Sequence, residues 1–167
     1  QGCVFGYIYN MDRGGISWLP IPTDHGRLGF GRINISGDGE YITYTAMKSL
    51  RNAIASKQSY VFDRSKGIFE SLNIAFNGAL GNGNTYGAVM DVSGRYVAFV
   101  SESSNLVPED TNGFADVFWL DRQTREVVRV STGLDGEPAD GDSGILAPGS
   151  GLHSLDISSD GQQLVYL

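Results

Sequence analysis

The sequence has little cysteine, little lysine and no long hydrophobic run, and each shortage excludes a class of protein. Cys3 is the single cysteine, so the chain forms no internal disulfide and holds no CxxC redox or zinc motif. We expect Cys3 to be a small, buried strand residue. Only Lys48, Lys57 and Lys66 are lysines. No apolar run approaches the roughly 20 residues that a membrane-spanning helix needs.

Positive charge is scarce overall. The chain has 12 basic and 19 acidic residues, a net charge of -7 at pH 7. Nucleic-acid affinity rests on clustered Lys and Arg, so we do not expect this chain to bind DNA or RNA. Its 167 residues suit one domain. Because the first residue is Gln1 and not Met, we expect a processed chain or a piece of a longer one.

Glycine is abundant, at 23 residues, and a glycine-containing turn recurs three times. The segment SGDGEYITY, which starts at Ser36, has counterparts in DVSGRYVAF and SSDGQQLVY. When Gly39, Gly94 and Gly161 are superposed, each copy is a tight turn followed by a β-rich run. We therefore predict three hairpins, with incoming strands at 33–35, 88–90 and 155–157 and equivalent second strands at 41–44, 96–100 and 164–167.

A second repeat alternates with the first. Segments 7–19, 59–72 and 116–130 each contain a strand, an Asp-Arg pair, a polar turn and another strand. The pairs begin at Asp12, Asp63 and Asp121. The two repeats together make a unit of four strands, which is typical of a β-propeller blade.

We therefore predict an all-β chain of β-propeller blades, each with four antiparallel strands, and three blades per chain. The expected units are a half-blade at 1–20, full blades at 33–72 and 88–131, and a half-blade at 155–167. In a propeller each sheet packs between two others, which explains nearly continuous apolar runs such as YVAFV. We expect four aromatic residues to lie in the core between blades: Tyr96, Phe99, Phe118 and Trp119.

These segments resemble the repeats of TolB-like six-bladed β-propellers, which pair a Ser-x-Asp-Gly turn with a following strand. The resemblance is most specific from Val92 to Ser131. The sequence departs from the family pattern at Ser93, where the turn usually has Asp. The resemblance implies a noncatalytic module that binds a protein or peptide partner at the loops around the channel mouth. It also implies a periplasmic, secreted or cell-surface location.

The segment DTNGFAD offers closely spaced oxygen ligands. Asp110, Asn112 and Asp116 flank a glycine in a shortened version of a calcium-binding loop. The segment lacks the bidentate Glu of an EF-hand. A calcium site is one hypothesis, and the alternative is an Asx turn that leads into a strand at Val117.

The connections before the first and last incoming strands hold the other candidate binding residues. Propeller connections of this kind lie around the mouth of the central channel. The candidates are Asp24, His25 and Arg27 before the first strand, and Asp140, Asp142 and His153 before the last.

Catalysis stays an open question in the sequence. Two histidines are fewer than the three that metal-dependent lyases on related propellers use, and no G-x-S-x-G elbow is present. Asp140 and Asp142 could serve a carbohydrate-binding or carbohydrate-cleaving propeller, which is the alternative function. A fragment of a larger propeller protein is a further alternative.

The expected strand pattern also predicts assembly. Segment 7–19 supplies the third and fourth strands of a blade, and segment 155–167 supplies the first and second. Three blades cannot surround an axis, whereas two copies joined head to tail give six blades. We therefore expect a head-to-tail homodimer of close to twice 18.0 kDa, in which the histidines of both copies surround one channel.

Overall fold

The structure is a computed structural model that describes residues 6–22, 25–28, 32–48, 56–145 and 154–167. In these residues the chain forms strands and no helix, as predicted. Cys3 lies outside them. The strands are β1 (Tyr7–Asn10), β2 (Gly15–Trp18), β3 (His25–Leu28), β4 (Asn34–Ile35), β5 (Tyr41–Lys48), β6 (Ser56–Asp63), β7 (Ile68–Ser71), β8 (Thr85–Met90), β9 (Tyr96–Ser101), β10 (Asp116–Asp121), β11 (Glu126–Arg129), β12 (Leu155–Ile157) and β13 (Leu164–Tyr166).

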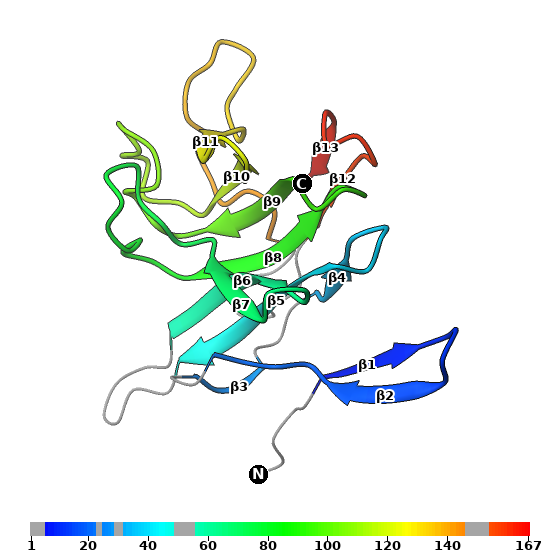
Figure 1. The fold of residues 1–167 in the computed structure, drawn as a ribbon. Helices are drawn as coiled ribbons and strands as arrows, with labels where there is room; N and C mark the ends of the chain where they lie inside the picture. Colours follow the sequence, from blue (N-terminus) through cyan, green and yellow to red (C-terminus); the bar gives the residue numbers. More distant parts are fainter. Residues whose placement is uncertain (1–5, 23–24, 29–31, 49–55, 146–153) are drawn as a thin grey trace.

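The strands form four antiparallel sheets that follow one another along the chain (Figure 1). The outer two are the hairpins β1–β2 and β12–β13. The inner two have the orders β3-β5-β6-β7, with β4 also paired to β5, and β8-β9-β10-β11. The described sheets form an open stack and do not close into a ring. Four-stranded antiparallel sheets of this kind are consistent with propeller blades.

Side-chain hydrogen bonds explain why the three predicted hairpin turns form. Ser36 Oγ donates to Asp38 Oδ1 over 2.6 Å, and Tyr41 N donates to Ser36 Oγ over 2.9 Å. Ser158 Oγ donates in the same way to Asp160 Oδ1. These bonds between near neighbours in the sequence stabilise the chain reversal.

In the middle turn, Ser and Asp have exchanged positions. Asp91 stands where the other turns have Ser, and Ser93 stands where they have Asp. Ser93 Oγ donates to Asp91 Oδ2 over 2.5 Å, and Tyr96 N donates to Asp91 Oδ1 over 2.8 Å. The departure at Ser93 therefore preserves the turn.

The glycines that end the second and third turns have two roles. Gly94 and Gly161 have φ values of +69° and +74°, which favour glycine. A Cβ atom on Gly94 would lie 2.5 Å from the ring of Tyr41 in the preceding sheet. A Cβ atom on Gly161 would lie 2.2 Å from the ring of Tyr96. The repeated glycine therefore also lets adjacent sheets pack closely.

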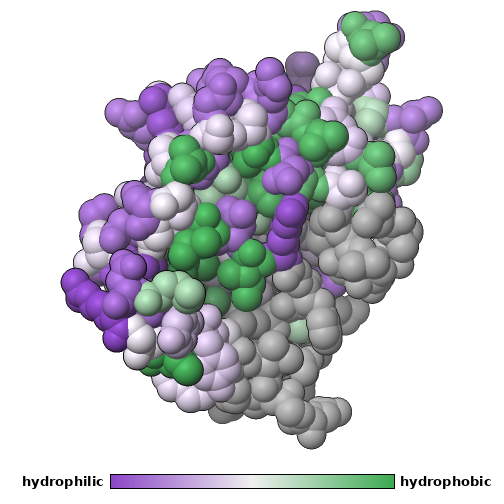
Figure 2. Space-filling model, turned by 90° about the vertical axis from the view of Figure 1, so that its right-hand side faces the viewer, coloured by the Kyte–Doolittle hydropathy of each residue, from purple (hydrophilic) through white to green (hydrophobic). Residues whose placement is uncertain are grey.

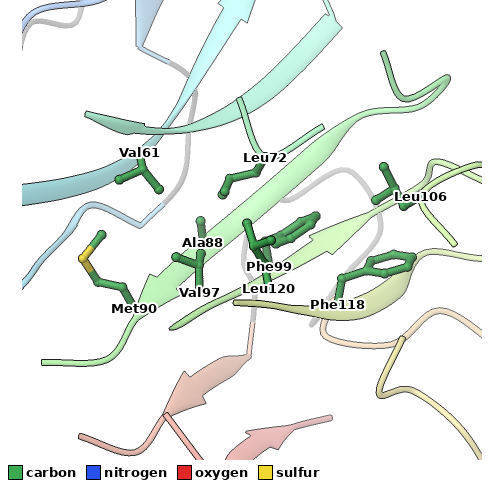
Figure 3. Packing of buried hydrophobic residues seen from close by; sticks show 9 residues of the cluster. All are labelled: Val61, Leu72, Ala88, Met90, Val97, Phe99, Leu106, Phe118 and Leu120. Atoms are coloured by element: carbon green, nitrogen blue, oxygen red, sulfur yellow. The ribbon is translucent and has the colours of Figure 1, made fainter. Parts of the chain in front are cut away.

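Three hydrophobic clusters fill the three spaces between successive sheets. The middle cluster joins Val61 and Leu72 to Phe99 and Phe118 of the next sheet (Figure 3). On β9, Val97 and Phe99 belong to this cluster, whereas Ala98 and Val100 belong to the next. Both faces of β9 are therefore buried, as its apolar run predicts.

The predicted aromatic core is largely confirmed. Phe99 and Phe118 are fully buried. Tyr96 and Trp119 are partly buried and stack with ring centroids 5.1 Å apart. Trp119 Nε1 donates to the Gly161 carbonyl of the last sheet. Trp119 therefore joins two sheets.

The structure corrects the alignment of the Asp-Arg pairs in the first copy. The amide that closes the turn is donated by Gly67 to Asp63 O and by Arg125 to Asp121 O. In the first hairpin, Gly14 N donates to Asn10 O over 2.9 Å. The counterpart of Asp63 and Asp121 is thus Asn10 and not Asp12, because the structural repeat follows the turn closure.

The side of the stack that carries the hairpin turns exposes hydrophobic residues (Figure 2). The hairpin turns point to the right in Figure 1, and Figure 2 looks onto this side. Hydrophobic residues gather across its middle, surrounded by hydrophilic ones (Figure 2). Ile35, just before the first turn, and Val92, inside the second, are each about half exposed. In the part of the chain described, no helix is long and apolar enough to cross a membrane.

Candidate functional site

The connections 72–84, 102–115 and 131–145 come at the strand ends remote from the hairpin turns, and we call this side the loop face. The loops before β8 and β10 lie on the left of Figure 1. The loop face carries every predicted calcium ligand, together with Asp140 and Asp142.

Connections 73–84 and 131–142 of the loop face are a repeat that the sequence interpretation missed. Each contains a small hairpin closed by an isolated bridge, Ile74 with Leu80 and Thr132 with Pro138. Gly78 and Gly136 occupy the same place in both and share a φ of +84°. The signal in the sequence is the pair of Asn-Gly and Asp-Gly dipeptides, which mark such turns.

The same repeat explains Asp142, one of the predicted binding residues. Asp142 Oδ1 accepts the Ala115 amide over 2.9 Å. Asn84, at the equivalent place in the preceding connection, accepts the Lys57 amide over 2.9 Å. Asn84 thus bonds its connection to β6, and Asp142 bonds its connection to the residue just before β10. Asp140 is exposed and lies two residues away.

Two connections of the loop face are joined by polar side chains. Ser103 Oγ donates to Asn73 Oδ1 over 2.8 Å, and both residues are buried. Asn82 Nδ2 donates to Ser104 Oγ over 2.9 Å, and Asn105 Nδ2 donates to the Leu80 carbonyl over 3.2 Å. Connections 72–84 and 102–105 are therefore one hydrogen-bonded unit.

The structure brings the three predicted calcium ligands together, and an arginine lies among them. Arg129 Nη1 is 2.9 Å from Asp110 Oδ1 and 3.7 Å from Asp116 Oδ2. Asn112 Nδ2 donates to Asp116 Oδ2 over 3.0 Å. Burial and the charge of Asp116 raise the pKa of Asp110, while Arg129 lowers it. The guanidinium thus supplies positive charge between two buried carboxylates.

The Asx-turn alternative is present in the same loop. Phe114 N donates to Asn112 Oδ1 over 3.1 Å, and Ser131 Oγ donates to Asp116 Oδ1 over 2.5 Å. The described residues contain no group of three or more His, Cys, Asp or Glu residues that could hold a metal ion. Calcium binding stays a prediction, which a calcium titration of the melting temperature tests.

The remaining predicted residues are placed in part. His25 and Arg27 lie in β3, where they pair with Lys48 and Met47, and not in a connection. The sequence interpretation missed β3 because β5 continues well beyond Tyr44 and pairs there with a second strand. Asp24 and His153 lie outside the described residues, so the structure does not show whether the histidines come together.

An apolar groove of about 550 Å³ opens between the second and third sheets. Its walls are the end of β7 with residues 72–78, residues 106–108, and strands β10 and β11 with the turn between them. Phe76, Val107, Pro108, Leu120 and Val127 line it. The volume lies within the range of ligand pockets.

The groove also has a charged rim that the sequence did not reveal. Arg125 lines the groove, and its Nη1 donates to Glu70 Oε1 over 2.9 Å. Arg122 Nε donates to Glu70 Oε2 over 3.0 Å. Glu70 lies 52 and 55 residues before the two arginines, and only the packing of the two sheets brings it to them.

Comparison with known proteins supports the fold and no particular family. No family model matches the chain, and no curated protein is similar to it in sequence. The tricorn protease aligns over 97% of this chain at a TM-score of 0.53 and 12% identity. The hydrazine synthase of Kuenenia stuttgartiensis aligns over 96% of it at a TM-score of 0.51 and 18% identity. Both are propeller-type folds. The chain spans only 13% and 42% of their respective lengths.

Proposed function

We propose that this chain is a noncatalytic propeller segment that binds a protein or peptide partner through its loop face. The observation that carries the proposal is a pair of exposed apolar side chains at equivalent loop tips. Phe76 is 63% exposed, and Leu134 is fully exposed. Because a few residues carry most of the binding energy at a protein interface, we assign these two tips as contact residues.

The loops that hold these tips are organised before any partner binds. Ala79 N donates to Asn77 Oδ1 over 3.0 Å, and Glu137 N donates to Asp135 Oδ1 over 3.3 Å. Each tip therefore has its own Asx turn. Preorganised loops lose little conformational freedom on binding, which favours affinity.

Photo-crosslinking from position 134, followed by mass spectrometry, identifies the partner. Binding of the purified partner is then measured for Phe76→Ser and Leu134→Ser. We expect about tenfold weaker binding for at least one variant, because each loses an apolar contact. Unchanged binding by both variants would contradict the proposal.

We further propose that the chain belongs to the TolB-like propellers and acts outside the cytoplasm. The Ser-x-Asp-Gly turns and their hydrogen bonds at Ser36 and Ser158 support this assignment. Fractionation of cells that express the complete gene product tests the location. Recovery of the protein with the cytoplasmic fraction would contradict it.

Carbohydrate binding or cleavage is the second candidate. It depends on the carboxylates of Asp140 and Asp142, and Asp142 already accepts a backbone amide. Glycan-array binding or release of reducing sugar that is lost in Asp140→Asn would favour this candidate over a protein partner.

We also propose that two copies assemble head to tail. Tyr7 and Tyr9, 59% and 57% exposed, stand in the first hairpin where Phe118 and Leu120 stand in β10. Phe118 and Leu120 pack on the preceding sheet. The equivalent face of β1–β2 is therefore open to a further sheet.

The third and last sheets together offer the matching surface. Trp119, Val130, Leu164 and Tyr166 line an open apolar pocket of about 360 Å³. Trp119 and Val130 stand where Val61 and Leu72 receive the next sheet inside the stack. The two open surfaces thus correspond to the two halves of the middle core, which supports head-to-tail contact between copies.

A further inference from the structure

We propose that the groove between β7 and β11 binds an extended peptide segment of a protein partner, through one bulky apolar side chain and a neighbouring carboxylate. The inference rests on the proposed function and narrows it to one surface and one chemistry. The apolar side chain would enter the groove of about 550 Å³ beside Phe76 and Val127.

The position of the groove favours an extended chain. β7 and β11 are the outermost strands of their sheets in the part of the chain described. An outermost strand presents backbone N–H and C=O groups that an added peptide can pair with. A segment lying along β11 would therefore gain backbone hydrogen bonds and place a side chain against Val127.

The charge at one end of the groove favours an acidic residue in the peptide. Glu70 is shared by Arg122 and Arg125, so these three groups carry one uncompensated positive charge. The side chain of Arg122 is 14% exposed, whereas that of Arg125 is 66% exposed. An exposed ion pair is weak, so Arg125 can bond a partner's carboxylate. The net charge of -7 disfavours acidic segments elsewhere.

Backbone strain points to the same groove. Arg125 and Glu109 are the two non-glycine residues with positive φ in the described chain, at +65° and +59°. Arg125 lines the groove, and Glu109 follows Pro108, which lines it from the connection before β10. In the first and second sheets, the residues that close the same turn with positive φ are Gly14 and Gly67. Strained backbone positions cluster at ligand-binding sites, so the positive φ of Arg125 supports a binding role for this residue.

The test uses the whole chain and a phage-displayed library of random peptides. Selected peptides are synthesised, and their dissociation constants are measured for the wild type, Phe76→Ser and Arg125→Gly. Arg125→Gly removes the charge and relieves the strain, so loss of binding by this variant does not reflect misfolding. Leu134→Ser, at the equivalent loop tip outside the groove, is measured beside them to separate the groove from the rest of the loop face. Arg13→Gln, in the first hairpin, is the matched control.

We expect enriched peptides to carry an aromatic or aliphatic residue near Asp or Glu, and to bind Phe76→Ser and Arg125→Gly about tenfold more weakly. The Arg13→Gln control should bind like the wild type. Enrichment without acidic residues, no enrichment, or binding that depends on Leu134 alone would overturn the groove assignment. The last outcome would leave the proposed function standing. Glycan binding or self-association that is lost in Phe76→Ser would also overturn it.

Discussion

At the scale of single residues, the clearest structural role belongs to Asp121. Its Oδ1 accepts the Gln123 amide over 2.9 Å, and its two oxygens accept Arg95 Nε and Nη2 over 3.0 and 2.6 Å. The Asp121 side chain therefore bonds a backbone amide as well as Arg95. We expect Asp121→Ala to lower the free energy of unfolding, measured by urea titration, and to leave partner binding intact. Native stability combined with lost binding would contradict this role.

Asp63 and Asp121 make the free energy of unfolding depend on pH. Hydrogen bonds from Lys66 lower the pKa of Asp63 from 3.8 to about 2, and those from Arg95 lower the pKa of Asp121. A lowered folded-state pKa contributes stability above the unfolded value of 3.8, and this contribution is lost as the pH falls toward 2. The loss of unfolding free energy as the pH falls, measured by urea titration, should be smaller in Asp121→Asn, because the asparagine side chain does not titrate.

At the scale of elements, the middle hairpin turn allows an exchange experiment. Asp91→Ser removes the carboxylate that Ser93 bonds, and Ser93→Asp places two carboxylates in contact. The double variant restores the arrangement of the turns at Ser36 and Ser158. We therefore expect both single variants to be destabilised and the double variant to recover, with a coupling energy of about 1 kcal/mol. Additive effects in urea titrations would show that the turns are not equivalent.

The packing between sheets gives a second test. Gly94→Ala adds a methyl group against Tyr41 at a residue with positive φ, so we expect a cost of about 2 kcal/mol or more. Gly67→Ala is the control, because its φ is +68° and nothing lies within 4 Å of the added Cβ. Equal costs would mean that backbone strain alone explains the repeated glycine.

The strands were predictable because their signals are local. A Ser or Asp side chain and a glycine fix each turn within four residues, and the apolar run that follows fixes the strand. β3 was missed because its partner is the far half of β5, which no local pattern of its own reveals. The groove and the Arg122–Glu70–Arg125 cluster were missed for the same reason, since they exist only after two sheets pack. Asp110 and Asp116 were found as a group, but their partner Arg129 follows them by a strand and a turn.

At the scale of the whole molecule, the repeat predicts how two copies would join. Inside the stack, Val97 pairs with Leu120, Ala98 with Trp119 and Phe99 with Phe118. The equivalent residues of β13 and of β1 in a second copy would be Leu164 with Tyr9, Val165 with Ile8, and Tyr166 with Tyr7. The β13 edge would then gain a third and fourth strand, as β5 and β9 have.

This register can be tested by disulfide formation in a Cys3→Ser background. Ile8→Cys combined with Val165→Cys places two thiols on directly opposed residues, so oxidation should link two chains. The linked species should migrate at twice 18.0 kDa, and light scattering of the reduced wild type should give the same mass. Ile8→Cys combined with Tyr166→Cys is the control, because a shift of one residue turns the second thiol to the other face of the strand. Equal linking of both pairs would disprove the register, and a folded monomer at micromolar concentration would disprove the assembly.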